Sequence, residues 1–199
     1  MVYTEGDSAL AGLMWNAHQA LDNETTYSAK RETIARNIVK SLPYAYYANT
    51  QRPVVIDKSR AWTTEPMYSL IKAYFGEPKI IVCVRKIEDV IKSFEMLFER
   101  NGRKDFRGSV FEHGMYLAME GVEFAKKQED QSVFHFVDYD DLVQNADLVL
   151  KNIYEFLGLK IYNHNFNKIV NNITWDDSIY GLSTMHDVRQ TIERRKYDI

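Results

Sequence analysis

The apolar positions of this chain change their spacing from one segment to the next. Ile80 to Val84 forms an unbroken apolar run rich in β-branched side chains, which is typical of a strand buried on both faces. Cys83 lies in this run, and we expect it to be buried with its neighbours. From Glu88 onward the spacing becomes that of an amphipathic helix, with apolar side chains at Val90, Ile91, Phe94, Leu97 and Phe98. The segment therefore predicts a strand, a tight loop and a helix.

The same patterns predict an α/β layered fold for the rest of the chain. Helices are expected over residues 8–21, 25–48, 64–75, 106–128 and 148–157, and strands over 54–56, 80–84 and 132–138. Pro43 should interrupt the second helix, Asp147 should cap the start of the last one, and Gly158 suits the left-handed position after its end. Strands joined through helices are parallel, so we expect the three strands in one sheet, with Asp57 and Arg85 at the same carboxyl edge.

The composition is that of one globular domain. With 199 residues, 45% of them hydrophobic, the chain can bury a core and does not require two domains. Its 25 basic and 28 acidic residues give a net charge of −3, which does not support general nucleic-acid binding, so any anion site must be local. One cysteine and five histidines show no metal-ligand spacing. We expect a cytoplasmic protein without disulfides, signal peptide or membrane span.

A basic side chain stands where the predicted strand ends. Arg85 is the first residue after the apolar run, and Ser93 follows eight positions later inside the predicted helix. A helix N-terminus presents N–H groups and the positive end of its dipole, and a guanidinium beside it adds a bidentate fork for an anion. The pair therefore predicts a phosphate site. The alternative is that Arg85 pairs with Glu88 or Asp89 and that Ser93 only packs.

Three segments in order resemble the sulfotransferases that take sulfuryl groups from 3′-phosphoadenosine 5′-phosphosulfate (PAPS). The first is the pair Arg85 and Ser93, although Lys-Ile replaces the Asp-Pro that usually follows the arginine. The second runs from the strand at 132–138 through Tyr-Asp-Asp-Leu at 139–142 to Phe-Leu-Gly-Leu at 156–159. The third is Val-Val-Ile-Asp-Lys-Ser-Arg at 54–60. The resemblance implies a three-layer, P-loop-nucleotide-hydrolase-like parallel sheet flanked by helices, PAPS as sulfuryl donor and no metal.

The resemblance also implies a role for several basic residues. Arg85 and Ser93 would hold the 3′-phosphate of PAPS. The C-terminal basic segment, in which the family often closes the nucleotide site, would add Arg189, Arg194 and Arg195. A solvated basic tail is the alternative for this last segment.

Sulfuryl transfer also requires a cation and a base. Negative charge develops on the bridging oxygen as the nucleotide leaves, and Lys58, at the end of a predicted parallel strand, is the candidate cation. Asp57 is the candidate base for the acceptor hydroxyl, although the neighbouring Lys58 and Arg60 should weaken it. The alternative is that Asp57 orients Lys58.

The start of the chain departs from the family. Sulfotransferases open with a strand and a Gly-rich loop that binds the 5′-phosphosulfate, and we expect both to be missing here, because no glycine is followed by Lys-Ser or Lys-Thr and no Gly-rich loop precedes the first helix. The chain is interpreted as one sulfotransferase-like domain over residues 1–199 that is truncated at its N-terminus. We therefore expect little or no activity from the chain alone, and a sheet edge exposed for self-association.

Two classes of function remain. The first is a PAPS-dependent sulfotransferase, or a truncated form of one, acting on a hydroxyl or amine of a carbohydrate, peptide or small molecule. The second is a non-catalytic relative that keeps the 3′-phosphate half of the site and binds a nucleotide or a partner. A phosphate-loop kinase is disfavoured because the chain lacks the Walker lysine and a Mg²⁺ ligand pattern.

Overall fold

The computed structural model describes residues 2–5, 9–25, 29–128, 130–171 and 176–192. The chain clusters into two compact units, each built from two separate stretches. The first unit takes Met1–Pro78 and Glu120–Val133, and the second takes Lys79–Met119 and Phe134–Ile199. The expectation of a single domain over residues 1–199 stays a prediction.

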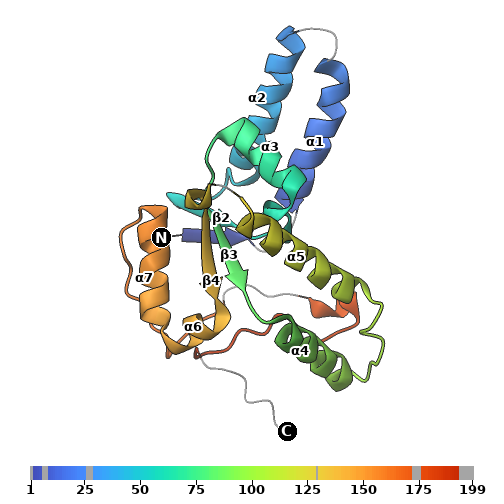
Figure 1. Cartoon of the computed structure of the whole chain (residues 1–199), viewed down its shortest axis with the longest axis vertical. Coiled ribbons are helices and arrows are strands. Elements are labelled where there is room, and N and C mark those ends of the chain that lie inside the picture. The colour runs from blue at the N-terminus through green and yellow to red at the C-terminus, as the bar shows by residue number, and fades with distance from the viewer. Residues whose placement is uncertain (1, 6–8, 26–28, 129, 172–175, 193–199) are drawn as a thin grey trace. The chain divides into compact units, whose positions relative to one another are not determined.

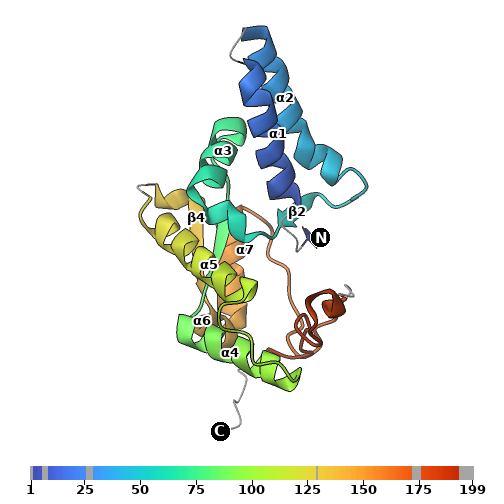
Figure 2. The ribbon, with the colours of Figure 1, turned by 90° about the vertical axis from the view of Figure 1, so that its right-hand side faces the viewer.

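The first unit combines a strand pair with a helical hairpin. Its elements are β1 (Val2–Glu5), α1 (Ala9–Thr25), α2 (Ala29–Tyr46), β2 (Val54–Asp57), the 3₁₀ helices η1 (Arg60–Thr63) and η2 (Gln131–Val133), α3 (Glu65–Phe75) and the end of α5 (Val110–Lys126). Helices α1 and α2 lie side by side (Figures 1 and 2). Apolar side chains one turn apart on these helices and on α3 form the core, which contains Leu10, Ala11, Met14, Val39, Met67 and Leu70.

An N-terminal strand is present, so the prediction that it is missing is wrong. β1 runs parallel to β2, with Val2 opposite Val54 and Glu5 opposite Asp57. Four residues are too few to show a periodicity, although Val, Tyr and Thr all favour strands. Residues 6–8, which separate β1 from α1 in the sequence, lie outside the described residues.

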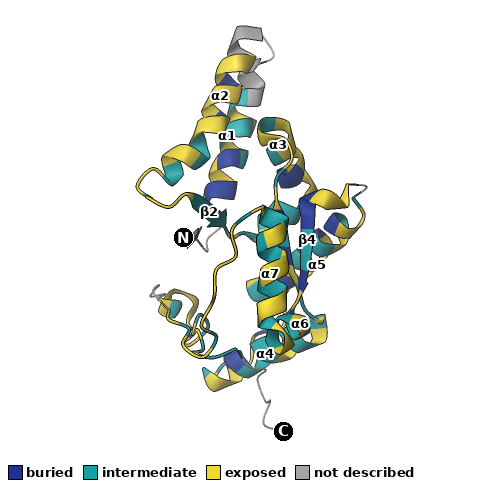
Figure 3. Cartoon of the chain, turned by 90° about the vertical axis from the view of Figure 1, so that its left-hand side faces the viewer, coloured by how far each residue is buried: buried dark blue, intermediate teal, exposed yellow. Residues whose placement is uncertain are grey.

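The second unit is built on another parallel strand pair. Its elements are β3 (Ile80–Val84), α4 (Ile87–Arg100), the first part of α5, β4 (Phe134–Asp138), α6 (Tyr139–Gln144), α7 (Ala146–Leu157) and η3 (Asp177–Tyr180). β3 and β4 pair from Ile80 opposite Phe134 to Val84 opposite Asp138 (Figure 1). The core of this unit contains Leu97, Phe98, Phe106, Met115 and Leu182. Helix α7 is amphipathic and only half covered, with intermediate and exposed residues along its length (Figure 3).

The expected three-stranded sheet is not formed among the described residues. β2 pairs with β1, and β3 pairs with β4, so the chain has two separate two-stranded sheets there. The parallel direction of β3 and β4 is confirmed, as is the order of strand, tight loop and helix from Ile80 to Arg100. The architecture is a mixed α/β fold with small parallel sheets.

Four local predictions also need correction. Pro43 does not interrupt α2, because it lies near the last turn and the helix continues to Tyr46. The residue before α7 is Asn145, and Asp147 lies in the first turn, where its charge still complements the helix dipole. Cys83 is exposed, since only Ile80 and Val82 of β3 are buried. Helix α5 begins at 110 rather than 106, and Phe106 packs in the core ahead of it.

No helix within the described ranges is both long and apolar enough to cross a membrane.

Replacing Gly158 with alanine should destabilise the protein. Gly158 follows α7 with φ of 67° and ψ of 28°, and its N–H donates to the carbonyl of Glu155. A Cβ at this left-handed position costs about 1 kcal/mol. The matched control is Gly12→Ala, because Gly12 lies inside α1 with open space around its Cα, and alanine there should stabilise by about 0.5–1 kcal/mol. Denaturant unfolding of both variants should give shifts of opposite sign, and equal shifts would contradict this account of the helix end.

Candidate functional site

The register of β3 and β4 brings two candidate residues together. Val84 lies opposite Asp138, so Arg85 and Tyr139 are the next residues along the two strands. The guanidinium of Arg85 lies over the ring of Tyr139, 4.3 Å from the ring centroid. This cation–π contact restrains the position of the guanidinium and of the N–H donors that it carries.

Helix α4 begins at Ile87, two residues after Arg85, and carries Ser93. Lys86 occupies the N-cap position without a side-chain cap, so the loop between strand and helix is only Arg85 and Lys86. Ser93, Leu97 and Arg100 follow one another at helical spacing and face the same pocket. This face also carries Phe94, so it is mostly apolar between the hydroxyl of Ser93 and the basic group of Arg100.

The pocket beside α4 has a volume of about 410 Å³, which suits a ligand the size of a nucleotide. Its charged lining consists of three arginines and one aspartate, and hydroxyl and apolar side chains complete it. The charged and hydroxyl-bearing residues are Arg85, Arg100, Arg189, Asp187, Ser93, Tyr139, Thr184 and Thr191. The excess of positive charge favours an anionic ligand.

Three of the residues expected from the sequence therefore line one pocket of the second unit. They are Arg85 directly after β3, Ser93 on α4 and Arg189 in the C-terminal segment. Arg85 and Arg189 are 104 residues apart in the sequence. Arg194 and Arg195 lie outside the described residues.

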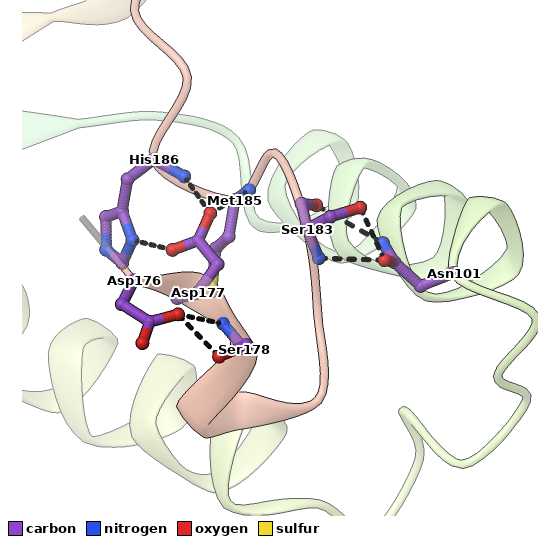
Figure 4. Close-up of polar contacts among 7 residues, drawn as sticks. All are labelled: Asn101, Asp176, Asp177, Ser178, Ser183, Met185 and His186. Carbon is purple, nitrogen blue, oxygen red and sulfur yellow. Dashed lines mark hydrogen bonds and ion pairs between the residues drawn. The ribbon is translucent and has the colours of Figure 1, made fainter. Parts of the chain in front are cut away.

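Hydrogen bonds attach the C-terminal segment to the end of α4. The side-chain oxygen of Asn101 accepts hydrogen bonds from the backbone N–H and the hydroxyl of Ser183, both at 2.8 Å (Figure 4). Its side-chain nitrogen donates to the carbonyls of Leu97, at 2.8 Å, and Ser183, at 3.3 Å. Arg103 donates to the carbonyl of Tyr180 at 2.8 Å. The segment that carries Arg189 is thus tied to the helix that carries Ser93.

Asp177 closes a second set of contacts within the segment. One of its oxygens accepts the backbone N–H groups of Met185, at 2.7 Å, and His186, at 3.1 Å, and the other pairs with the His186 ring (Figure 4). Burial raises the pKa of Asp177, but the hydrogen bonds from His186 and Met185 outweigh it, so the pKa lies below the ordinary value of 3.8.

Asp57 and Lys58 belong to the first unit, where Asp57 is held by aromatic donors. One carboxylate oxygen accepts the Tyr47 hydroxyl, and the other accepts the indole N–H of Trp62 at 2.7 Å. Lys58 follows the end of β2 and is exposed. The two donors hold Asp57 at the end of β2, which suits it for a positioning role.

Several residues that line the pocket or lie beside it were not predicted from the sequence. Tyr139 was given no role in a site, although the parallel pairing of strands 80–84 and 132–138 would have placed it beside Arg85. Arg100 follows Ser93 and Leu97 at helical spacing, so its place on the same helix face could have been predicted from that spacing. No pattern in the sequence predicts the roles of Asn101 and Thr184, because these roles depend on contacts between distant segments.

Comparison with known proteins identifies the family. The model of the sulfotransferase family matches residues 7–163, so the chain belongs to that family. Its structure is similar to the sulfotransferase domain from the curacin biosynthetic pathway, with a TM-score of 0.52 and 18% sequence identity over 88% of this chain. The chain spans 64% of the length of that domain, and the likeness is one of fold. No curated protein matches the chain.

The Asp177 contacts predict how stability depends on pH. Because folding lowers the pKa of Asp177, its ionised form contributes stability that is present above the ordinary pKa of 3.8 and is lost as pH falls through the lower folded value. Wild type should exceed Asp177→Asn in stability, and the difference should shrink below about pH 4. Thermal unfolding between about pH 5 and pH 2.5, below the range where histidine titrates, measures this difference. A difference that stays constant across that range would exclude the ionic contribution.

Proposed function

We propose that the chain is a PAPS-dependent sulfotransferase that holds the 3′-phosphate of the donor in the pocket beside α4. The proposal rests on one observation, the meeting of Arg85, Ser93 and Arg189 in a pocket with excess positive charge. Arg85 would supply the bidentate contact, with its position restrained by Tyr139, and Ser93 would donate its hydroxyl. The positive charges of Arg100 and Arg189 would offset the remaining negative charge of the phosphate.

A separate part of the proposal concerns the end of the β1 and β2 pair in the first unit. Glu5 and Asp57 are opposite each other in parallel strands, so both strands end at the same edge. After β1 the sequence is Gly6, Asp7 and Ser8, and after β2 it is Lys58. Phosphate sites in α/β folds form where a strand, a short loop with glycine and a helix follow one another. We assign the 5′-phosphosulfate to this edge, within a three-layer nucleotide-binding fold.

The proposed chemistry is transfer of the sulfuryl group to a hydroxyl or amine. The acceptor oxygen or nitrogen forms a bond to sulfur, the bond between sulfur and the bridging oxygen breaks, and adenosine 3′,5′-bisphosphate leaves with the electron pair. Lys58 would stabilise the charge on that bridging oxygen. Asp57 would hold the end of β2, and with it Lys58, in place. The acceptor proton passes to a base or to water as the new bond forms.

The second candidate is a non-catalytic nucleotide-binding domain, and Asp7 favours it. Family members hold the 5′-phosphosulfate with backbone amides and with basic or hydroxyl side chains, whereas Asp7 places a carboxylate in the sequence after β1. A carboxylate near the transferred group would repel it. Carbohydrate, peptide and small-molecule acceptors remain equally suitable for the first candidate, and self-association through a sheet edge stays a prediction.

Arg85→Ala should weaken binding of adenosine 3′,5′-bisphosphate about 10- to 100-fold, because a charge-assisted hydrogen bond contributes roughly 1.5–3 kcal/mol. Isothermal titration calorimetry measures the affinity, with AMP as the ligand that lacks the 3′-phosphate. Arg107→Ala is the matched control, because Arg107 lies in the same unit, pairs with Glu95 and Glu112, and does not line the pocket. Equal affinities of wild type and Arg85→Ala, or of the bisphosphate and AMP, would reject the 3′-phosphate site.

Lys58→Ala should separate the two candidate functions. In a sulfotransferase it should lower turnover of PAPS about 100- to 1,000-fold, which is typical of removing one group that stabilises transition-state charge. Affinity for adenosine 3′,5′-bisphosphate should change much less, because the proposed 3′-phosphate contacts are all in the second unit. The measurement is release of the bisphosphate with a panel of hydroxyl and amine acceptors. Binding without turnover in the wild-type chain would instead support the nucleotide-binding domain.

A further inference from the structure

Thr184 has an unusual backbone conformation at the edge of the pocket. Its φ is 62°, and it is the only residue other than glycine with a positive φ in the part of the chain that the structure describes. A β-branched residue is strained in this conformation, at a cost of about 1–3 kcal/mol, and glycine would adopt it without that cost. Strain of this kind persists where the surrounding structure imposes it, and it is often found at ligand sites.

Contacts on both sides of Thr184 impose its conformation. On one side, Ser183 is bound through its N–H, its hydroxyl and its carbonyl to the side chain of Asn101, the residue that follows α4 (Figure 4). On the other side, Met185 and His186 donate their N–H groups to Asp177. The residues before and after Thr184 are therefore fixed to different elements, and the turn at Thr184 must join them.

The turn is also part of the pocket that holds the proposed nucleotide site. Thr184 and Met185 line that pocket together with Arg85, Ser93 and Arg189. Asn101 follows the helix that carries Ser93, so it sets the position of Thr184 relative to Ser93. Thr184 is exposed and lines the pocket, and it is not part of the core, so packing gives no reason for a threonine rather than a glycine.

We propose that Thr184 is a ligand-binding residue whose hydroxyl donates a hydrogen bond to the anionic group held by Arg85, Ser93 and Arg189, and that Asn101 and Asp177 are positioning residues for it. This inference rests on the proposed nucleotide site. The chemistry fits a phosphate, which has three acceptor oxygens and is already faced by guanidinium groups and one serine hydroxyl. The strained turn brings a second hydroxyl to the same group.

Three substitutions at Thr184 test the role of the hydroxyl. Thr184→Val keeps the branched shape and the strain but removes the hydroxyl, so affinity for adenosine 3′,5′-bisphosphate should fall about 10-fold with little change in melting temperature. Thr184→Ser keeps the hydroxyl and should retain affinity within about 3-fold. Thr184→Gly should raise the melting temperature by about 2–4 °C and yet bind about 10-fold more weakly, because it relieves strain and removes the donor.

A double-mutant cycle tests the positioning role of Asn101. Asn101→Ala should weaken binding of the bisphosphate in the wild-type background, and the effect should largely disappear in the Thr184→Val background, because Asn101 acts through the Thr184 hydroxyl. A purely structural role would lower stability equally in both backgrounds and would show no coupling in affinity. Additive effects on affinity would overturn the positioning role.

The same titrations separate this inference from the proposed function. If wild type binds the bisphosphate and Arg85→Ala weakens binding, but Thr184→Val binds as well as wild type, the role of Thr184 is overturned while the nucleotide site stands. If wild type does not bind the bisphosphate, both are overturned. Weak binding by Thr184→Val and Thr184→Gly, with retention by Thr184→Ser, is the expected result.

Discussion

The parallel pairing of β3 with β4 is the constraint on which the candidate site depends. Because Val84 is opposite Asp138, both strands end at the same level, and the residues that follow them meet. One end delivers Arg85 and the start of α4, and the other delivers Tyr139 and the start of α6. A shift of one strand by one residue would separate the guanidinium from the ring and turn the side chains of the shifted strand to the other face. The meeting of Arg85 and Tyr139 in the pocket therefore depends on the backbone pairing.

The C-terminal segment completes the pocket, and among its described residues the only regular element is the short helix η3. It contributes Thr184, Met185 and Arg189 to the pocket lining. Hydrogen bonds to the side chains of Asn101 and Asp177 hold this part of the segment in place. Irregular segments need such bonds, because their backbone groups lack a helix or a sheet to satisfy them. The shape of the pocket therefore depends on polar side chains that do not line it, those of Asn101 and Asp177.

The sequence predicted the parts of this site that depend on local pattern. The apolar run at 80–84 and the helical spacing after Glu88 located Arg85 and Ser93 correctly on a strand end and a helix. The sequence did not predict the strand pairing, because β1 is too short to show a periodicity and β2, which pairs with β1, was expected in one sheet with the other two strands. It also failed where distant segments meet, as Asn101 and Ser183 do across 82 positions. Cys83 was placed in the core because an apolar run does not reveal which face of a strand is covered.

The contact of the Arg85 guanidinium with the Tyr139 ring has a consequence for the free energy of ligand binding. A free arginine side chain samples many rotamers, and a ligand that binds it must restrict them at a cost of up to about 2 kcal/mol. The ring under the Arg85 guanidinium, at 4.3 Å, already restricts those rotamers before a ligand arrives. An anion that enters the pocket thus meets a preorganised fork, and less of the association free energy is spent on ordering the side chain. Tyr139 in this way acts on the entropy of binding even where it touches no ligand atom.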